Sequence, residues 1–374
     1  MKSFLITLLS SAIHNKPMVD ISTSKLSEKE WNTLFELSSQ QGIKAIVLNA
    51  ISQSSLSVQI PKSIKMKWLA SVVRVEDEYH NRLQKAAEFA ELMAGKGLNT
   101  LTLKGVAIST YYPEPSHREF GDLDAYLFAG IPIQVQWGSG YEPGNGFAEK
   151  AGAKVQRGHY KHSHVHFKGL MIENHQYFLP IRGNKSTKEL EKHLREIAIN
   201  IDEVKYVDNT KLLIPSADFN ALFLTAHAMN HFLYESIKMR HVLDWALFVK
   251  AEYKHVDWKS FWEWCDKMHY TRFVECINWI CEQKIGMDKE VMQIVKTGHV
   301  STFDVEKWGQ RILDDIFDGD SVYNKGNSTL IVRLNLAKNF FQSAWKYRYI
   351  AQKNFIIDLL RQGTAMIWDR NPKL

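Results

Sequence analysis

Residues 122–127 constrain this 374-residue chain more than any other stretch, because they place two aspartates on an otherwise apolar strand. Side chains alternate along a strand, so Asp122 and Asp124 share one face, about 7 Å apart at Cα. Two like charges side by side are unfavourable unless a cation lies between them. Carboxylate oxygens are the ligands that hard cations such as Mg²⁺ prefer. An isolated pair of this kind is more often a solvated strand end, so the neighbouring residues decide between the two interpretations.

The residues before the two aspartates favour phosphate chemistry. An apolar strand at 100–103 leads into Lys104-Gly105, which supplies a flexible turn, free amides at a helix start and a cation. Arg118 adds a fixed positive charge four residues before Asp122, and Gly121 directly precedes the pair.

This pattern, L-K-G followed by R-x-x-G-D-L-D, resembles the polymerase-β-type nucleotidyltransferases, and most closely a bacterial family of uncharacterised nucleotidyltransferases. The resemblance implies that Asp122 and Asp124 bind metal, and that Lys104, Gly105, Arg118 and Gly121 bind the nucleotide. It also implies a third carboxylate on a later strand.

Residues 162–178 supply the candidate for that third carboxylate. They are typical of two strands joined at Lys168-Gly169, because a two-residue turn ending in Gly favours a tight hairpin. This register pairs Phe167 with Leu170 and His164 with Glu173. Glu173-Asn-His175 matches the family's carboxylate-x-His pattern, with Glu where such strands often carry Asp. The resemblance therefore implies Glu173 as the third catalytic and metal-binding carboxylate.

The same register puts several imidazoles beside Glu173, from residues His162, His164, His166 and His175. Three interpretations stay open. The histidines form a half-exposed polar strand face, a wall of the active site that contacts phosphate or substrate, or a zinc site built on His162, His164 and His166.

What the resemblance implies about function is a Mg²⁺- or Mn²⁺-dependent transfer of a nucleoside monophosphate from an NTP, with release of pyrophosphate. The acceptor stays open between RNA, a protein and a small molecule. The alternative is a non-catalytic protein that keeps the fold and binds a nucleotide or a partner. A zinc hydrolase is a third hypothesis.

A predicted helix over 218–234 carries His227 and His231 four residues apart. Such a spacing is able to bind metal, but Ala228 stands where a metalloprotease needs Glu, so that activity is excluded. Arg240 and Asp244, also four apart, make a helical ion pair. The resemblance implies that His227, Arg240 and Asp244 support the active site.

Charge and composition bound the remaining possibilities. The formal net charge is +6, and residues 325–374 hold nine Lys and Arg against Asp358 and Asp369. A basic set of C-terminal helices allows a nucleic-acid partner, or it is a solvated helix face. Three cysteines at 265, 276 and 281 predict reduced, buried thiols.

The expected fold class is α+β, a small mixed β-sheet core flanked by helical regions. We expect an N-terminal helical region at 1–98, the nucleotidyltransferase-like core at 99–214 and a C-terminal helical domain at 215–374. The first apolar run is short and amphipathic, and no later one has the length of a membrane span, so we expect a cytoplasmic protein without a membrane partner. The glycine-rich stretch 137–146 predicts a mobile connection or a nucleotide contact before a short helix at 147–153. Ser27 and Glu30 predict a capping box at the start of a helix, and residues 204–207 with 211–214 predict a further strand pair. We expect the remaining helices near 257–284, 302–318 and 327–362.

Overall fold

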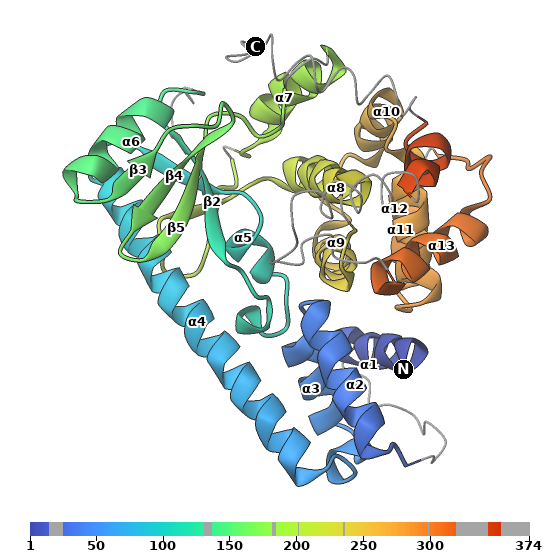
Figure 1. Ribbon diagram of the computed structural model, residues 1–374. Helices are drawn as coiled ribbons and strands as arrows, with labels where there is room; N and C mark the ends of the chain where they lie inside the picture. Colours follow the sequence, from blue (N-terminus) through green and yellow to red (C-terminus); the bar gives the residue numbers. More distant parts are fainter. Residues whose placement is uncertain are drawn as a thin grey trace, which may run out of the picture. The chain divides into compact units, whose positions relative to one another are not determined.

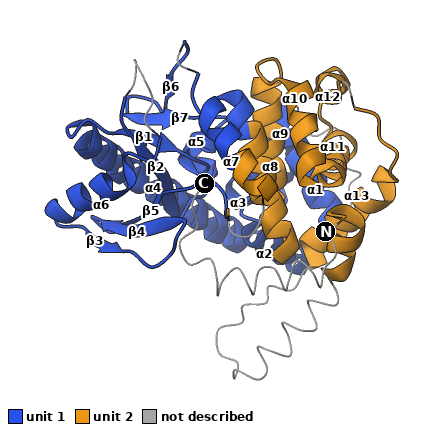
Figure 2. Ribbon diagram, turned by 90° about the horizontal axis from the view of Figure 1, so that it is seen from above, with its two compact units in different colours: residues 1–180, 191–220 blue, residues 181–190, 221–374 orange. Residues whose placement is uncertain are grey.

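The computed structural model describes residues 1–14, 25–130, 137–181, 185–200, 202–234, 236–297, 299–318 and 343–352. The chain divides into two compact units (Figure 2): Met1–Pro180 with Glu191–Asn220, called the sheet unit, and Ile181–Leu190 with Ala221–Leu374, called the helical unit. Each unit is described by itself. The division into three regions drawn from the sequence stays a prediction.

The sheet unit begins with helices, whose bounds are α1 Lys2–His14, α2 Glu28–Gln40, α3 Lys44–Ser52, η1 Ser55–Val58 and α4 Lys62–Ala94. The predicted capping box is confirmed at α2: Glu30 N donates to Ser27 Oγ, and Ser27 N donates to Glu30 Oε2 at 2.8 Å. The long helix α4 leads the chain directly to the first strand (Figure 1).

The described strands form one mixed sheet in the order β3-β4-β5-β2-β1-β7-β6. Their bounds are β1 Asn99–Thr102, β2 Asp122–Phe128, β3 Lys154–Gln156, β4 His162–Phe167, β5 Leu170–His175, β6 Lys205–Tyr206 and β7 Leu212–Ile214. β2 is parallel to β5 and antiparallel to β1, while β1 is parallel to β7. The mixed sheet and the α+β composition agree with the expectation from the sequence.

One face of this sheet is covered by α4. Phe89, Ala90 and Met93 of the helix belong to the same buried cluster as Leu123 and Leu127 of β2. Since strand residues alternate, packing these leucines against α4 directs Asp122 and Asp124 to the opposite face. The short elements between β1 and β2 are α5 Val106–Ser109 and η2 Pro115–His117.

The glycine-rich stretch is not the mobile connection expected from the sequence. Residues Tyr141–Lys150 form helix α6, which contacts β2, β3, β4 and β5. A Cβ at Gly140 would lie 2.3 Å from the backbone carbon of Leu127, and one at Gly144 would lie 2.2 Å from its Cδ1. These two glycines therefore allow α6 to pack closely against β2. In the sequence, glycines that are needed for close packing look the same as glycines of a flexible loop.

Helix α7 (Lys185–Ile197) follows β5, and the predicted strand pair β6–β7 is confirmed as antiparallel. Helix α8 (Ala217–Tyr234) begins in the sheet unit and continues into the helical unit. The further elements of the helical unit are α9 Met239–Glu252, α10 Trp258–Met268, α11 Thr271–Gln283, α12 Lys289–Val295, α13 Val305–Asp318 and the π-helical turn η3 Lys346–Ile350.

The single helix expected over 257–284 is two helices, because His269 adopts the left-handed conformation (φ 58°) and ends α10. Most of the helix expected over 327–362 lies outside the described residues. Cys265, Cys276 and Cys281 are buried free thiols, as predicted. Within the described ranges, every helix is too short or too polar to cross a bilayer.

Candidate functional site

The sheet places the three predicted carboxylates on one face. The predicted hairpin register is confirmed, with Phe167 opposite Leu170 and His164 opposite Glu173. The turn residues Lys168 and Gly169 both have positive φ, as a tight two-residue hairpin requires. In addition, β5 lies beside β2 with Glu173 paired to Asp124. Asp124 and Glu173 are therefore lateral neighbours, and Asp122 precedes them on the same face.

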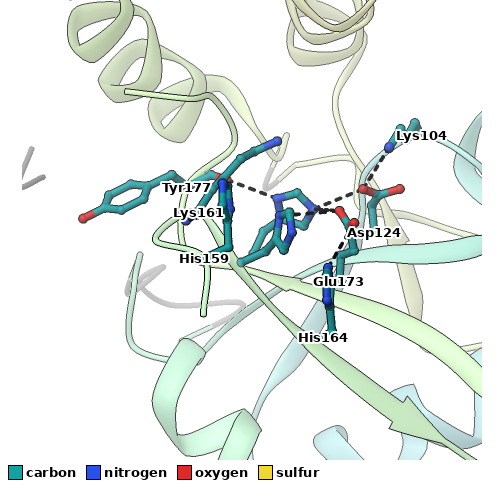
Figure 3. Close-up of polar contacts among 9 residues, drawn as sticks. Lys104, Asp124, His159, Lys161, His164, Glu173 and Tyr177 are labelled. Carbon is teal, nitrogen blue, oxygen red and sulfur yellow. Dashed lines mark hydrogen bonds and ion pairs between the residues drawn. The ribbon is translucent and has the colours of Figure 1, made fainter. Parts of the chain in front are cut away.

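Asp124 is the most buried of the three carboxylates, with 4% of the residue exposed, and Figure 3 draws its contacts. Its Oδ1 lies 3.1 Å from Lys104 Nζ and 3.1 Å from His175 Nε2. Burial raises the pKa of Asp124, but the Lys104 ammonium and the hydrogen bond from His175 outweigh burial and hold the pKa well below its ordinary value. Asp124 is therefore ionised at neutral pH.

Glu173 is surrounded by imidazoles. Its Oε2 lies 3.4 Å from His175 Nε2 and 3.5 Å from His162 Nδ1, and its Oε1 lies 3.7 Å from His164 Nε2. Burial raises the pKa of Glu173, but the hydrogen bond with His175 and the electrostatic effects of His175 and His162 outweigh burial. The pKa of Glu173 therefore lies below its ordinary value.

Asp122 behaves in the opposite way. Burial and then the negative charge of Asp124 raise its pKa, and the attraction of Lys104 does not compensate. The negative charges of Asp124 and Glu173 thus repel an ionised Asp122. A bound cation would remove this electrostatic cost.

Lys104 follows β1 and supplies the ammonium of the cluster. Burial lowers the pKa of Lys104, but the negative charges of Asp124 and Asp122 raise it by more. The pKa of Lys104 therefore lies above its ordinary value. Gly105 has φ 49° and ψ −110°, a conformation that glycine adopts readily and other residues do not. This glycine turns the chain so that Lys104 faces the carboxylates while α5 starts beside it.

His175 joins the two ionised carboxylates. Only 1% of this residue is exposed, and Nδ1 lies 3.2 Å from the carbonyl oxygen of Tyr177 while Nε2 faces Asp124 and Glu173. A carbonyl accepts hydrogen bonds only, so Nδ1 carries a proton. Nε2 faces the two carboxylates, so a cation bound between them would lie within its reach.

His162 is a further candidate ligand. Burial and then the charge of His175 lower its pKa to about 3, so its imidazole is neutral at physiological pH. Its Nδ1 is buried without a hydrogen-bond partner among the described residues. Single ligand atoms of His162, Glu173 and His175 lie within 4.8 Å of one another. This grouping differs from the sequence-based trio of His162, His164 and His166, because β5 supplies two of its three members.

The other predicted site residues take several positions. Gly121 is exposed, with open space where a Cβ would lie. Arg118 is 7% exposed, and its Nη1 donates to the carbonyl of Glu119 at 3.1 Å. His166 shares the face of the cluster, at the end of β4 opposite Met171. His227, Arg240 and Asp244 lie on α8 and α9 of the helical unit, and their support of the active site stays a prediction.

Lys161 is a cation of this site that the sequence analysis missed. It directly precedes β4 and is drawn together with the carboxylates and histidines in Figure 3. Burial lowers its pKa, while Asp124 and Glu173 act on it in the opposite direction. No motif marks this lysine, and only its position directly before the histidine-rich strand could have suggested it.

A family model described as "Uncharacterised nucleotidyltransferase" matches residues 27–286. Searches of curated proteins and of solved structures find no match. The matched range includes every carboxylate, lysine and histidine of the site described above.

Proposed function

The chain belongs to the family of uncharacterised nucleotidyltransferases, and from this premise we propose that it transfers a nucleoside monophosphate from an NTP to a hydroxyl acceptor and releases pyrophosphate. The observation that carries the proposal is the pairing of Asp124 with Glu173 across parallel strands, with Asp122 on the same face. It brings together carboxylates that lie about fifty residues apart in the chain. A glycine turn, a strand with two aspartates and a carboxylate on a neighbouring strand also suit a polymerase-β-type core.

The donor set fits a divalent cation. Asp122, Asp124 and Glu173 supply hard oxygen ligands, and the pKa of Asp122 is raised by burial and then by the negative charges of Asp124 and Glu173. Both neighbours of Asp124, Lys104 and His175, approach the same carboxylate oxygen, Oδ1. We propose that these three carboxylates hold Mg²⁺ or Mn²⁺, which supplies charge neutralisation at the phosphates and lowers the pKa of the attacking hydroxyl.

The positive groups of the chain would orient the triphosphate. Lys104 lies 3.1 Å from Asp124, so an ammonium is already held beside the carboxylates. The backbone of the Gly105 turn directly follows Lys104. Arg118 and Gly121 precede the start of β2. These residues would stabilise the negative charge that develops on the β- and γ-phosphates of the leaving group, with Lys161 as a second cation.

Glu173 is suited to accept the proton of the attacking hydroxyl. Its lowered pKa keeps it ionised at neutral pH, and His175 and His162 hold its carboxylate from one side. His164 contacts its other oxygen and would form part of the wall that contacts the acceptor. The acceptor itself is an RNA, a protein hydroxyl or a small molecule. An RNA acceptor predicts an affinity that falls steeply with salt.

A second candidate function follows from the contacts of Asp124. Lys104 already neutralises this carboxylate and His175 contacts the same oxygen, so the fold does not require a further cation at Asp124. A protein that binds a nucleotide or a partner without catalysis would use the site in this state. It predicts nucleotide binding without pyrophosphate release.

The test is pyrophosphate release from each of the four NTPs with Mg²⁺ and a cell lysate as the source of acceptor. Release that disappears in the Asp122→Ala, Asp124→Ala double variant supports the proposal. Glu149→Gln is the matched control, because Glu149 is a carboxylate of α6 paired with Arg157 outside the site. Nucleotide binding without pyrophosphate release by the wild type would favour the non-catalytic binding protein. The absence of both nucleotide binding and pyrophosphate release would refute both proposed functions.

A further inference from the structure

Three histidines of the helical unit converge on one another. His227 and His231 lie one turn apart on α8, and His241 lies in the first turn of α9. The ring centroids are 4.5 Å apart for His227 and His231, 5.3 Å for His231 and His241, and 6.1 Å for His227 and His241. Single ring nitrogens of all three lie within 4.8 Å of one another. We call this group the histidine triad.

We propose that the histidine triad is a binding site for a borderline divalent metal ion, with Zn²⁺ as the best fit. Two histidines four residues apart share one helix face and chelate a single ion, and the third comes from the following helix. A tetrahedral zinc ion with bonds of 2.0–2.1 Å holds its ligand nitrogens about 3.4 Å apart. Small side-chain rotations would close the difference from the observed spacing.

The donor chemistry selects the kind of metal. The triad offers imidazole nitrogens only, which suit Zn²⁺, Ni²⁺ and Cu²⁺, whereas Mg²⁺ prefers the oxygen ligands of the carboxylate site. All three histidines are partly exposed, so an ion has access from solvent. Three protein ligands leave one coordination position for water or another ligand.

Metal binding would change a hydrogen bond of His241. The Lys238 backbone amide donates to His241 Nδ1 at 2.9 Å, so the proton of a neutral His241 ring is on Nε2. A metal on Nδ1 displaces this amide, and a metal on Nε2 displaces the proton and moves it to Nδ1. The start of α9 therefore rearranges slightly when the ion binds. Ala228 occupies the position of a metalloprotease base, so the site is a binding site without that hydrolytic chemistry.

The inference does not depend on the reaction proposed above, and the experiment keeps the two sites apart. The full-length protein without an affinity tag is stripped of metal and titrated with Zn²⁺ in the presence of excess Mg²⁺, which occupies oxygen ligands. We expect one Zn²⁺ per chain. His231→Gln should weaken binding by more than the roughly 10–100-fold that the loss of an outer-shell partner costs.

Two control variants change a histidine outside the triad and a member of the second possible metal cluster. His80→Gln changes an exposed histidine of α4 and should bind Zn²⁺ like the wild type. Glu173→Gln removes a member of the other possible cluster and should also retain the ion. His241→Gln tests the triad from a different helix, and circular dichroism checks that each variant folds.

A rise in melting temperature with Zn²⁺ that is lost only in the triad variants would be a second supporting result. No binding by the wild type would overturn the proposal. So would binding that Glu173→Gln abolishes and His231→Gln leaves intact.

Discussion

The sheet unit and the helical unit both bury charged side chains, but they arrange them in opposite ways. On β2 and β5, three carboxylates share one face, and the charge of Asp124 contributes to the raised pKa of Asp122. In the helical unit, Lys346 is 2% exposed and its Nζ lies 2.6 Å from Asp315 Oδ2. Its ammonium also lies 4.9 Å from the ring centre of Phe232.

The difference separates a site from a structural contact. A buried ion pair satisfies its own charges, so its removal should affect folding. A cluster of like charges is unfavourable in the metal-free protein, and a ligand that carries the opposite charge would relieve the repulsion. The comparison therefore predicts that substitutions in the two regions move different measurable quantities.

The largest expected effect is on activity. Glu173→Gln should lower the rate of pyrophosphate release by roughly 10²–10³-fold, the scale of losing one preorganised electrostatic group. The lowered pKa of Glu173 means that its ionised form stabilises the fold, so urea unfolding of this variant should show a loss of stability, but a smaller one than the loss of the buried Lys346–Asp315 pair causes. Glu149→Gln should change neither quantity. A large loss of stability in Glu173→Gln would place Glu173 among the structural charges and break the comparison.

The next effect is on folding. Asp315→Ala leaves the buried Lys346 ammonium without its carboxylate and should lower the free energy of unfolding by about 3 kcal/mol. Replacing both residues by Lys346→Met and Asp315→Leu should recover most of this loss, because the pair is then apolar. Urea denaturation measures both. Activity per folded molecule should be unchanged, and a selective loss of activity would contradict the assignment.

The packing of β2 gives a smaller effect on stability. Gly140→Ala places a Cβ against the backbone of Leu127 and should destabilise the protein by about 2 kcal/mol. Gly146→Ala in the interior of α6 meets no atom within 4 Å and should stabilise it by about 0.5–1 kcal/mol. Thermal unfolding of the two variants compares them directly. Equal effects would show that residues 140–146 do not pack as a helix on β2.

The smallest effect concerns Asp122 in metal-free protein. Its raised pKa means that the ionised form destabilises the fold, so Asp122→Asn should increase stability at neutral pH by about 0.5–1 kcal/mol. The stability gap should shrink as the pH falls through the folded-state pKa, where the wild-type carboxyl becomes protonated. Saturating Mg²⁺ should reverse the sign. Denaturation with EDTA across a pH series tests this, and a destabilised variant in EDTA would argue against charge repulsion.

Local signals explain what the sequence predicted correctly. Lys168-Gly169 sets the hairpin register, and with it the pairing of His164 and Glu173, because a two-residue turn leaves only one in-register alignment. The alternation around Asp122 and Asp124 likewise fixed which face carries the carboxylates. Both arguments use residues that are close together in the chain.

The remaining features depend on contacts between distant segments. No local pattern states that β5 lies parallel to β2, although this pairing brings Glu173 to Asp124. Lys161 belongs to no motif, and only the fold brings it near the carboxylates and histidines. Gly140 and Gly144 were misinterpreted because glycines required for close packing have the same composition as a loop. The division of the helix at His269 is similarly hidden, because a left-handed histidine is not a typical helix end.

The central claim is that the carboxylate site cleaves the bond between the α- and β-phosphates of an NTP. The most direct measurement follows two labels, on the α- and γ-phosphorus of the same NTP, in the presence of Mg²⁺ and acceptor. We predict that the α-label moves to the acceptor and that the γ-label is recovered as pyrophosphate, and that neither occurs with Glu173→Gln. A γ-label found on the acceptor or as inorganic phosphate, or transfer that survives Glu173→Gln, would contradict the account.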